Sequence, residues 1–251
     1  MIVNFYHILK SKYFLFFKYS FYHLIGNHFP GLLSDKISAK TQYFLSMEEE
    51  LDLKNPTSFT AKIQWLKLYD HNLLYTSLVD KYTVKQFVAG LIGDKYIIPT
   101  LGVWEKFEDI DFNQLPQQFV LKSTHDSASV IIVKDKSKFD KDAARRKLSR
   151  SLHKNFYLAS REWPYKNVPR RIIAEQLMHD DSSSGSDLDD YKWYCFNGEP
   201  KFCQVIKNRN TDETIDFFDI NWTHQDFIGL NPKARFSEIS IYKPELLDSM
   251  I

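Results

Sequence analysis

The sequence is poor in the residues that most often build metal and disulfide sites. Its 251 residues include only two cysteines, Cys195 and Cys203. Neither has another cysteine or a histidine at the spacing of a metal–thiolate centre. No small-residue cleavage site follows the apolar N-terminus, so the sequence shows no secretory signature. We therefore expect reduced thiols in a cytoplasmic protein and no metal–thiolate site.

A surplus of charge is also absent. The chain has 33 Lys and Arg residues against 32 Asp and Glu residues, for a formal net charge of +1. Proteins that hold nucleic acid by bulk electrostatics carry a clear basic surplus. We therefore expect no nucleic-acid partner. The length is enough for one large domain or two small ones with a sizeable core.

Acidic residues are missing from one stretch, residues 1–34, which is also dense in aromatic side chains. Lys10, Lys12 and Lys18 interrupt its apolar run too often for a comfortable transmembrane span. Basic, aromatic helices lie on anionic membrane surfaces. Two interpretations stay open. Residues 1–30 contact the inner face of a membrane, which makes the protein peripheral there, or they form a helix packed on the domain.

Helical and strand-like patterns alternate along the rest of the chain and predict an α/β fold built of α+β subdomains. Helices are expected after a cap at Thr57 or Ser58, from about Leu78 to Ile92 with Gly93 as C-cap, and over 141–155. Strands are expected at 96–98, 119–121, 130–133, 171–177, 190–196, 201–206 and 215–220. Asn197–Gly198 predicts a type I′ hairpin turn.

The stretch from Phe119 to Val133 places one lysine, Lys122, at the end of a strand and before a polar loop. An ammonium group there can neutralise a phosphate, and backbone N–H groups of a loop with small side chains can approach phosphate oxygens. The loop has no glycine, since Ser127, Ala128 and Ser129 stand where such loops often carry one. The pattern still predicts a nucleotide phosphate site; the alternative is a hairpin with an exposed lysine.

Several further blocks occur in a fixed order with this one: NPTSFTAKIQWLKLYD (55–70), LVDKYTVKQFV (78–88), YIIPTLGVWEKFEDIDFNQLPQQFVLKSTHDS (96–127), REWPYKNVPRRIIAEQLM (161–178) and DYKWYCFNGEPKF (190–202). Together they resemble the TupA-like ATP-grasp family, named for teichuronopeptide biosynthesis and associated with cell-surface polysaccharide synthesis. The resemblance covers roughly residues 50–251.

This resemblance implies a site for ATP and Mg²⁺. By motif position Lys122 contacts the phosphates together with the loop residues Ser123, Ser127 and Ser129, and Lys81 is a second cation near the nucleotide. The backbone of a hinge recognises adenine, and Asp190 hydrogen-bonds the ribose. The hinge residues are Glu175, Gln176, Leu177 and Met178. The implied reaction ligates an amine to a carboxylate through an acylphosphate, with a carboxylate-bearing sugar or peptide as acceptor.

The resemblance also predicts how the chain is divided. We expect a basic aromatic helical segment, an N-terminal α/β part, a central ATP-grasp subdomain, a flexible acidic loop and an incomplete C-terminal subdomain, over residues 1–50, 51–117, 118–180, 181–189 and 190–251. The helix-like segment 244–251 stops without a cap. We therefore expect the last strands of the fold to be missing, and this chain to be weakly active or inactive as a ligase.

Metal-binding carboxylates are the weak point of this prediction. Asp216 and Asp219 are the nearest strand-like pair, and residues three apart on a strand project to opposite faces. Their catalytic role and the metal ligands stay unassigned. Asp187-Leu-Asp189 matches a short pattern of metal-dependent glycosyltransferases, which gives a second hypothesis. A non-catalytic, membrane-associated remnant is the third.

Overall fold

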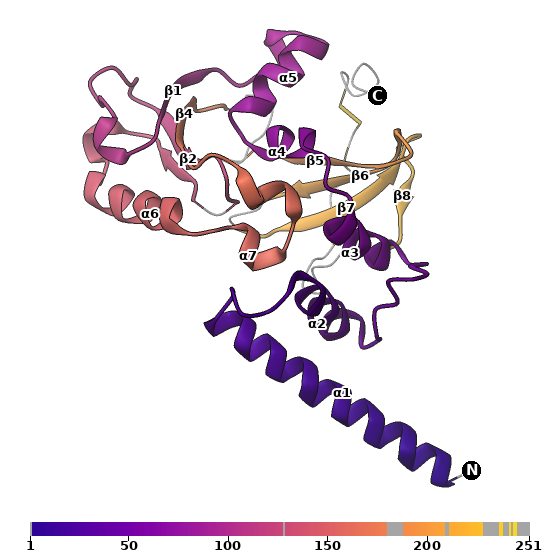
Figure 1. The fold of residues 1–251 in the computed structure, drawn as a ribbon. Helices are drawn as coiled ribbons and strands as arrows, with labels where there is room; N and C mark the ends of the chain where they lie inside the picture. The colour runs from indigo at the N-terminus through magenta and orange to yellow at the C-terminus, as the bar shows by residue number, and fades with distance from the viewer. Residues whose placement is uncertain are drawn as a thin grey trace. The chain divides into compact units, whose positions relative to one another are not determined.

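The structure is a computed structural model that describes residues 2–127, 129–179, 188–208, 211–227, 236–237, 241 and 243–244, with side chains from Lys12 onward. The chain divides into two compact units, Met1–Leu177 and Met178–Ile251 (Figure 1). The finer subdivision expected from the sequence stays a prediction. Asp187 and most of the acidic loop, like the helix-like segment after residue 244, lie outside the described residues.

The first unit begins with two helices, α1 (Ile2–His28) and α2 (Asp35–Met47). Ser34 caps α2, since its hydroxyl accepts a hydrogen bond from Ile37 N. The helices pack through Tyr19, which is buried and stacks on Phe44 with ring centroids 4.6 Å apart. No helix in the described part of the chain is long and apolar enough to cross a membrane.

Helix α3 (Phe59–Tyr69) starts as the sequence predicted, with the Ser58 hydroxyl accepting from Ala61 N. The helix expected from about Leu78 to Ile92 is wrong in its first part. The chain forms α4 (Leu74–Val79), breaks, and resumes as α5 (Thr83–Ile92), which ends at Gly93 with φ of +96°. Tertiary contacts accompany the break, because Lys81 N donates to Thr124 O and the buried Asp80 pairs with Arg171.

The strand expected at 96–98 is also misplaced. Residues 94–96 form a 3-10 turn, and the strand β1 covers Thr100–Trp104, beyond Pro99. The carbonyl oxygen of Ile98 accepts a hydrogen bond from Lys85 Nζ, so a side chain takes the acceptor that a strand neighbour would have used. The apolar pattern predicted a strand in this region but placed it too early in the chain.

One four-stranded antiparallel sheet forms the body of this unit, in the order β1-β4-β2-β3. Its other strands are β4 (Ile172–Gln176), β2 (Phe119–Ser123) and β3 (Ile131–Val133), close to the predicted ranges. Helix α6 (Lys141–His153), capped by Asp140, buries Leu148 against the sheet core. The short helix α7 (Tyr157–Ser160) follows and leads back towards β4.

The second unit is a four-stranded antiparallel sheet in sequential order, β5 (Asp190–Phe196), β6 (Glu199–Lys207), β7 (Thr214–Asp219) and β8 (His224–Gln225). Asn197 and Gly198 both have positive φ, +54° and +83°, as the predicted type I′ turn requires. The cysteines do not face each other, since Cys195 pairs with Pro200 and Cys203 with Trp193. Both described sheets are wholly antiparallel, so the fold is of the α+β type.

Candidate functional site

The centre of the candidate site is the carboxylate of Glu175. Lys122 of β2 lies opposite Ile173 of β4, so its side chain shares a face with Ile173 and with Glu175, two residues further along. Lys122 Nζ forms an ion pair with one oxygen of Glu175. Lys85 Nζ lies 2.6 Å from the other oxygen. The Glu175 side chain is only 4% exposed, so both lysines hold their charges against a largely buried partner.

Lys85 was not among the predicted site residues. It comes from α5, and its ammonium group also donates to Ile98 O at 2.6 Å and to Thr100 Oγ1 at 3.1 Å. These contacts link α5 to the start of β1. The only hint in the sequence was its position four residues after Lys81, a spacing common among lysines that serve no site.

Lys81 occupies the break between α4 and α5. Its Nζ donates to the backbone oxygen of Asp126, and its N–H donates to Thr124 O at 3.1 Å. Burial lowers the pKa of Lys81 below its ordinary value of 10.5, against the attraction of Asp126, and the positive charge of Lys122 adds to the lowering. The charges of Lys81 and Lys122 therefore interact. Two cations that bind the same polyanion must lie close enough for such an interaction.

The loop after β2 is held by its own side chains. The Asp126 carboxylate accepts from Ser129 Oγ at 2.5 Å and from the hydroxyl of Ser151. Ser129 Oγ in turn accepts from Ser123 N at 2.9 Å, so Ser129 is buried and engaged within the loop. Ser127 is exposed. Ser123 is fully buried, and its hydroxyl has no hydrogen-bond partner among the described residues.

Two further pairs support this arrangement, and the sequence did not single them out as a network. Asp80, just before Lys81, is buried and forms an ion pair with Arg171, whose guanidinium also lies 4.8 Å from the centre of the Tyr82 ring. His125 is buried and its Nε2 hydrogen-bonds Ser151 O at 3.2 Å. The contacts of Asp126 with Ser129 and Ser151 stabilise the turn that contains His125 and Asp126.

The predicted adenine hinge begins with Glu175 itself. Gln176 N donates to Pro99 O at 3.0 Å, which continues the pairing of β4 with β1. The division between the two units falls between Leu177 and Met178, inside the hinge. Lys81, Lys122, Ser123, Ser127, Ser129, Glu175, Gln176 and Leu177 thus belong to the first unit, and Met178, Asp190, Asp216 and Asp219 to the second.

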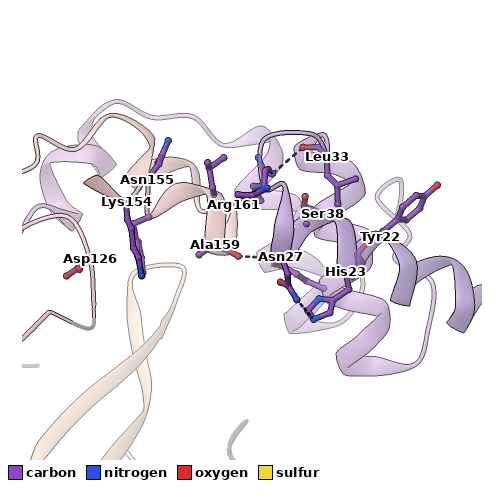
Figure 2. Close-up of a pocket in the computed structure, with 16 residues that line it drawn as sticks. Tyr22, His23, Asn27, Leu33, Ser38, Asp126, Lys154, Asn155, Ala159 and Arg161 are labelled. Carbon is purple, nitrogen blue, oxygen red and sulfur yellow. Dashed lines mark hydrogen bonds between the residues drawn. The ribbon is translucent and has the colours of Figure 1, made fainter. Parts of the chain in front are cut away.

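We call Lys81, Lys85 and Lys122 the lysine cluster. The first unit also contains a cavity of about 570 Å³ that is distinct from this cluster. Figure 2 shows that it lies between α1 and α2 on one side, with Tyr22, His23 and Ser38, and the segment after α6 on the other. Asp126 is the residue that the cavity shares with the loop after β2. Lys81, Lys85 and Lys122 do not line it.

A model of the TupA-like ATP-grasp family matches residues 61–251, a range that contains the lysine cluster, the loop and the hinge. The chain belongs to this family. Comparison with curated proteins and with solved structures gave no match. Family membership supports ATP binding in general, whereas the role of each residue in this ATP-grasp protein rests on the geometry above.

The residues of the lysine cluster fit a nucleotide. The ammonium groups of Lys85 and Lys122 pair with the Glu175 carboxylate, and that of Lys81 binds the backbone oxygen of Asp126. With the Asp126 carboxylate counted, three lysines and two carboxylates leave one net positive charge. The Asp80–Arg171 pair beside them cancels. A partly buried positive charge next to a loop with small side chains suits a phosphate group.

A magnesium site finds less support. The described residues contain no group of three or more His, Cys, Asp or Glu side chains that could hold a metal ion. Asp216 is buried and accepts hydrogen bonds from His224 Nε2 at 2.9 Å and from Ser237 N at 3.1 Å. Asp219 accepts from the N–H groups of Asn221 and Thr223, both at 2.9 Å. These contacts fit structural roles, so neither carboxylate suits Mg²⁺ here.

The Asp187-Leu-Asp189 pattern can be followed at one end only. Asp189 forms an ion pair with Lys207 at 2.7 Å, and Asp187 lies outside the described residues. A carboxylate paired with a lysine on the adjoining strand is explained by that contact. Nothing in the described geometry favours the glycosyltransferase hypothesis.

Proposed function

We propose that this ATP-grasp protein binds ATP with the phosphates at Lys122 and Lys81 and adenine at the hinge after β4. The observation that carries the proposal is the shared carboxylate of Glu175, which holds the ammonium groups of Lys85 and Lys122 together, with Lys122 one residue before the end of β2. A lysine side chain loses conformational entropy when it binds a ligand. Lysines already held by Glu175 have less of that entropy to lose.

The backbone contacts refine the hinge assignment. Since Gln176 N–H already donates to Pro99 O, the adenine edge is recognised further along, at the backbone of Leu177 and Met178. Leu177 and Met178 also offer apolar side chains to the ring. Ser127, exposed on the loop, contributes a hydroxyl or its backbone N–H to the phosphates. The ribose contact expected at Asp190, in the second unit, stays a prediction.

We further propose that the reaction is the ligation of an amine, such as an amino acid, to a carboxylate in cell-surface polysaccharide or teichuronopeptide synthesis. ATP supplies the phosphoryl group that activates the carboxylate. The lysine cluster orients the phosphates and balances their charge. Mg²⁺ would accompany ATP, held by the phosphates and by carboxylates other than Asp216 and Asp219.

The test is ADP formation by the purified protein with Mg²⁺, measured with and without each candidate carboxylate sugar and amine. The proposal predicts that ADP forms, at the low rate expected from the sequence, only when a carboxylate acceptor is present, and that hydroxylamine in place of the amine yields a hydroxamate from the same acceptor. Lys122→Ala should abolish both signals. ATP binding without ADP formation for any acceptor would restrict the protein to nucleotide binding and remove the ligase proposal.

A further inference from the structure

Helix α1 leaves one face without a partner in the described part of the chain. Its packed face is marked by Tyr19, which is buried on α2. The opposite face carries Tyr13, Phe17, Phe21 and Leu24, spaced four, four and three residues apart, which places them on one stripe. Their exposed fractions are 73%, 72%, 51% and 55%. We call these four residues the outer stripe.

Apolar side chains beside the outer stripe enlarge the exposed surface. Phe14 is 67% exposed and lies one helical turn from Phe17, and Phe29 and Leu32 remain exposed in the turn after the helix. Apolar patches of this kind on a water-exposed helix mark sites that contact another molecule or a membrane. Four of these seven side chains are phenylalanines and one is a tyrosine, whose ring suits the boundary between water and lipid.

The acidic side chains around α1 contact it from one side only. Residues 1–34 contain no Asp or Glu. The nearby acidic side chains contact the helix from the α2 side, since Glu48 pairs with Lys12 at 2.9 Å and Glu50 accepts from the Tyr19 hydroxyl at 3.1 Å. Lys18, with its ammonium 4.8 Å from the centre of the Tyr19 ring, adds a cation. The outer stripe therefore lies on a helix whose own charges are all positive.

We propose that α1 docks on an anionic lipid surface through the outer stripe, with the helix axis parallel to the membrane. The aromatic and leucine side chains enter the boundary of the acyl chains, and Lys10 and Lys18 supply the cations for the lipid headgroups, since Lys12 is paired with Glu48 on the α2 side. Charge complementarity selects this partner over a second copy of the chain, because two copies meeting through this face would bring like charges together. The proposal goes beyond ATP binding and does not depend on it.

The experiment is flotation of the full 251-residue chain with vesicles, one set of phosphatidylcholine alone and one of an equimolar mixture of phosphatidylcholine and phosphatidylglycerol. Binding is expected on the anionic vesicles, weaker on the neutral ones, and reduced by added salt. The double variant Phe17→Ser/Phe21→Ser should lower the vesicle partition coefficient by about tenfold or more. Because both side chains are exposed, the variant should unfold at the same temperature as the parent.

A matched control removes two apolar side chains of similar exposure elsewhere in the same unit. Leu73 and Leu91 are 75% and 69% exposed, and Leu73→Ser/Leu91→Ser should leave vesicle binding unchanged. The proposal is overturned if the parent ignores anionic vesicles, or if both double variants bind like the parent. It is also overturned if Phe17→Ser/Phe21→Ser converts a dimer into a monomer by sedimentation velocity and leaves vesicle binding intact, since α1 would then pair with a second copy.

Discussion

Lys122 and Glu175 join their charged groups between two neighbouring antiparallel strands, β2 and β4, and Lys85 binds the second oxygen of the same carboxylate. The carboxylate is thus shared by a lysine of the sheet and a lysine of α5. Such sharing positions both ammonium groups while leaving part of their charge unbalanced.

Glu175→Gln should destabilise the first unit. The substitution keeps the side-chain shape and removes the charge, so two largely buried ammonium groups face each other without a carboxylate between them. The expected loss of unfolding free energy is about 3 kcal/mol, measured by urea denaturation. Glu48→Gln is the control, because its pair with Lys12 is exposed and should contribute little. Equal effects of the two substitutions would show that Glu175 is not a buried anchor.

Lys85→Ala should weaken ATP binding, although Lys85 was not among the site residues predicted from the sequence. Without Lys85, Lys122 is the remaining partner of Glu175 in this pair of lysines. The carboxylate then attracts the Lys122 ammonium group more strongly and weakens its contact with phosphate. The effects of Lys85→Ala and Lys122→Ala should therefore not add, with a coupling energy above about 0.5 kcal/mol. Calorimetric titration of both single variants, the double variant and the parent measures it. Additive losses would mean that the two lysines act independently.

His125 should make the protein less stable in acid. Burial lowers the pKa of His125 below its ordinary value of 6.5, against the attraction of Asp126, with Arg170 adding a smaller lowering. As the pH falls below about 6.5, His125 becomes protonated in the unfolded chain but stays neutral in the folded protein. The unfolding free energy therefore falls from that pH down to the folded pKa and levels off below it.

The substitution His125→Gln should flatten this fall in unfolding free energy between neutral pH and the folded pKa. Denaturant unfolding at a series of pH values gives the slope for the parent and the variant. His153→Gln is the control, since His153 is exposed at the end of α6 and its ring hydrogen-bonds Ser149 O of the same helix. An unchanged slope in His125→Gln would show that His125 does not set the acid limit.

Arg161 connects the start of α2 to the end of α7. Its guanidinium pairs with Asp35 at 2.9 Å and donates to the carbonyl oxygens of Pro30 and Leu33. Figure 2 shows Arg161 directed towards Leu33. Arg161→Ala should lower the unfolding free energy, measured by urea denaturation, by about 3 kcal/mol. The substitution removes a hydrogen-bond donor from one carboxylate and two carbonyl oxygens. Amide exchange should accelerate in the first turn of α2, whereas Arg145→Ala, in an exposed 3.7 Å pair with Asp142, should change neither measurement.

Local signals were enough to predict much of this fold. The Ser58 cap, the Gly93 end of α5 and the Asn197–Gly198 turn each depend on a few neighbouring residues, and the structure has all three. Tertiary contacts decided the errors. Asp80 and Lys81 interrupt the predicted helix because Arg171 and the loop after β2, far along the chain, bind them.

The candidate site divides in the same way. Lys122 was predictable from one segment, since a strand, a lysine and a polar loop follow each other in sequence. Lys85 was not, because its role comes from the antiparallel pairing that brings Glu175 to the face of β2 and from the packing of α5 beside it. The burial of Ser129, which removes its hydroxyl from the loop surface, likewise comes from Asp126 and Ser123 N.

The central claim is that Lys122 binds the phosphates of ATP, and calorimetric titration of the purified chain with ATP and Mg²⁺ tests it most directly. The parent should bind ATP, and Lys122→Ala should lose about 1.5–3 kcal/mol of binding free energy, the range of one charge-assisted contact. Lys134→Ala, which removes an exposed lysine just after β3, should bind like the parent. Equal affinity of Lys122→Ala and the parent, or no ATP binding by the parent, would contradict the account.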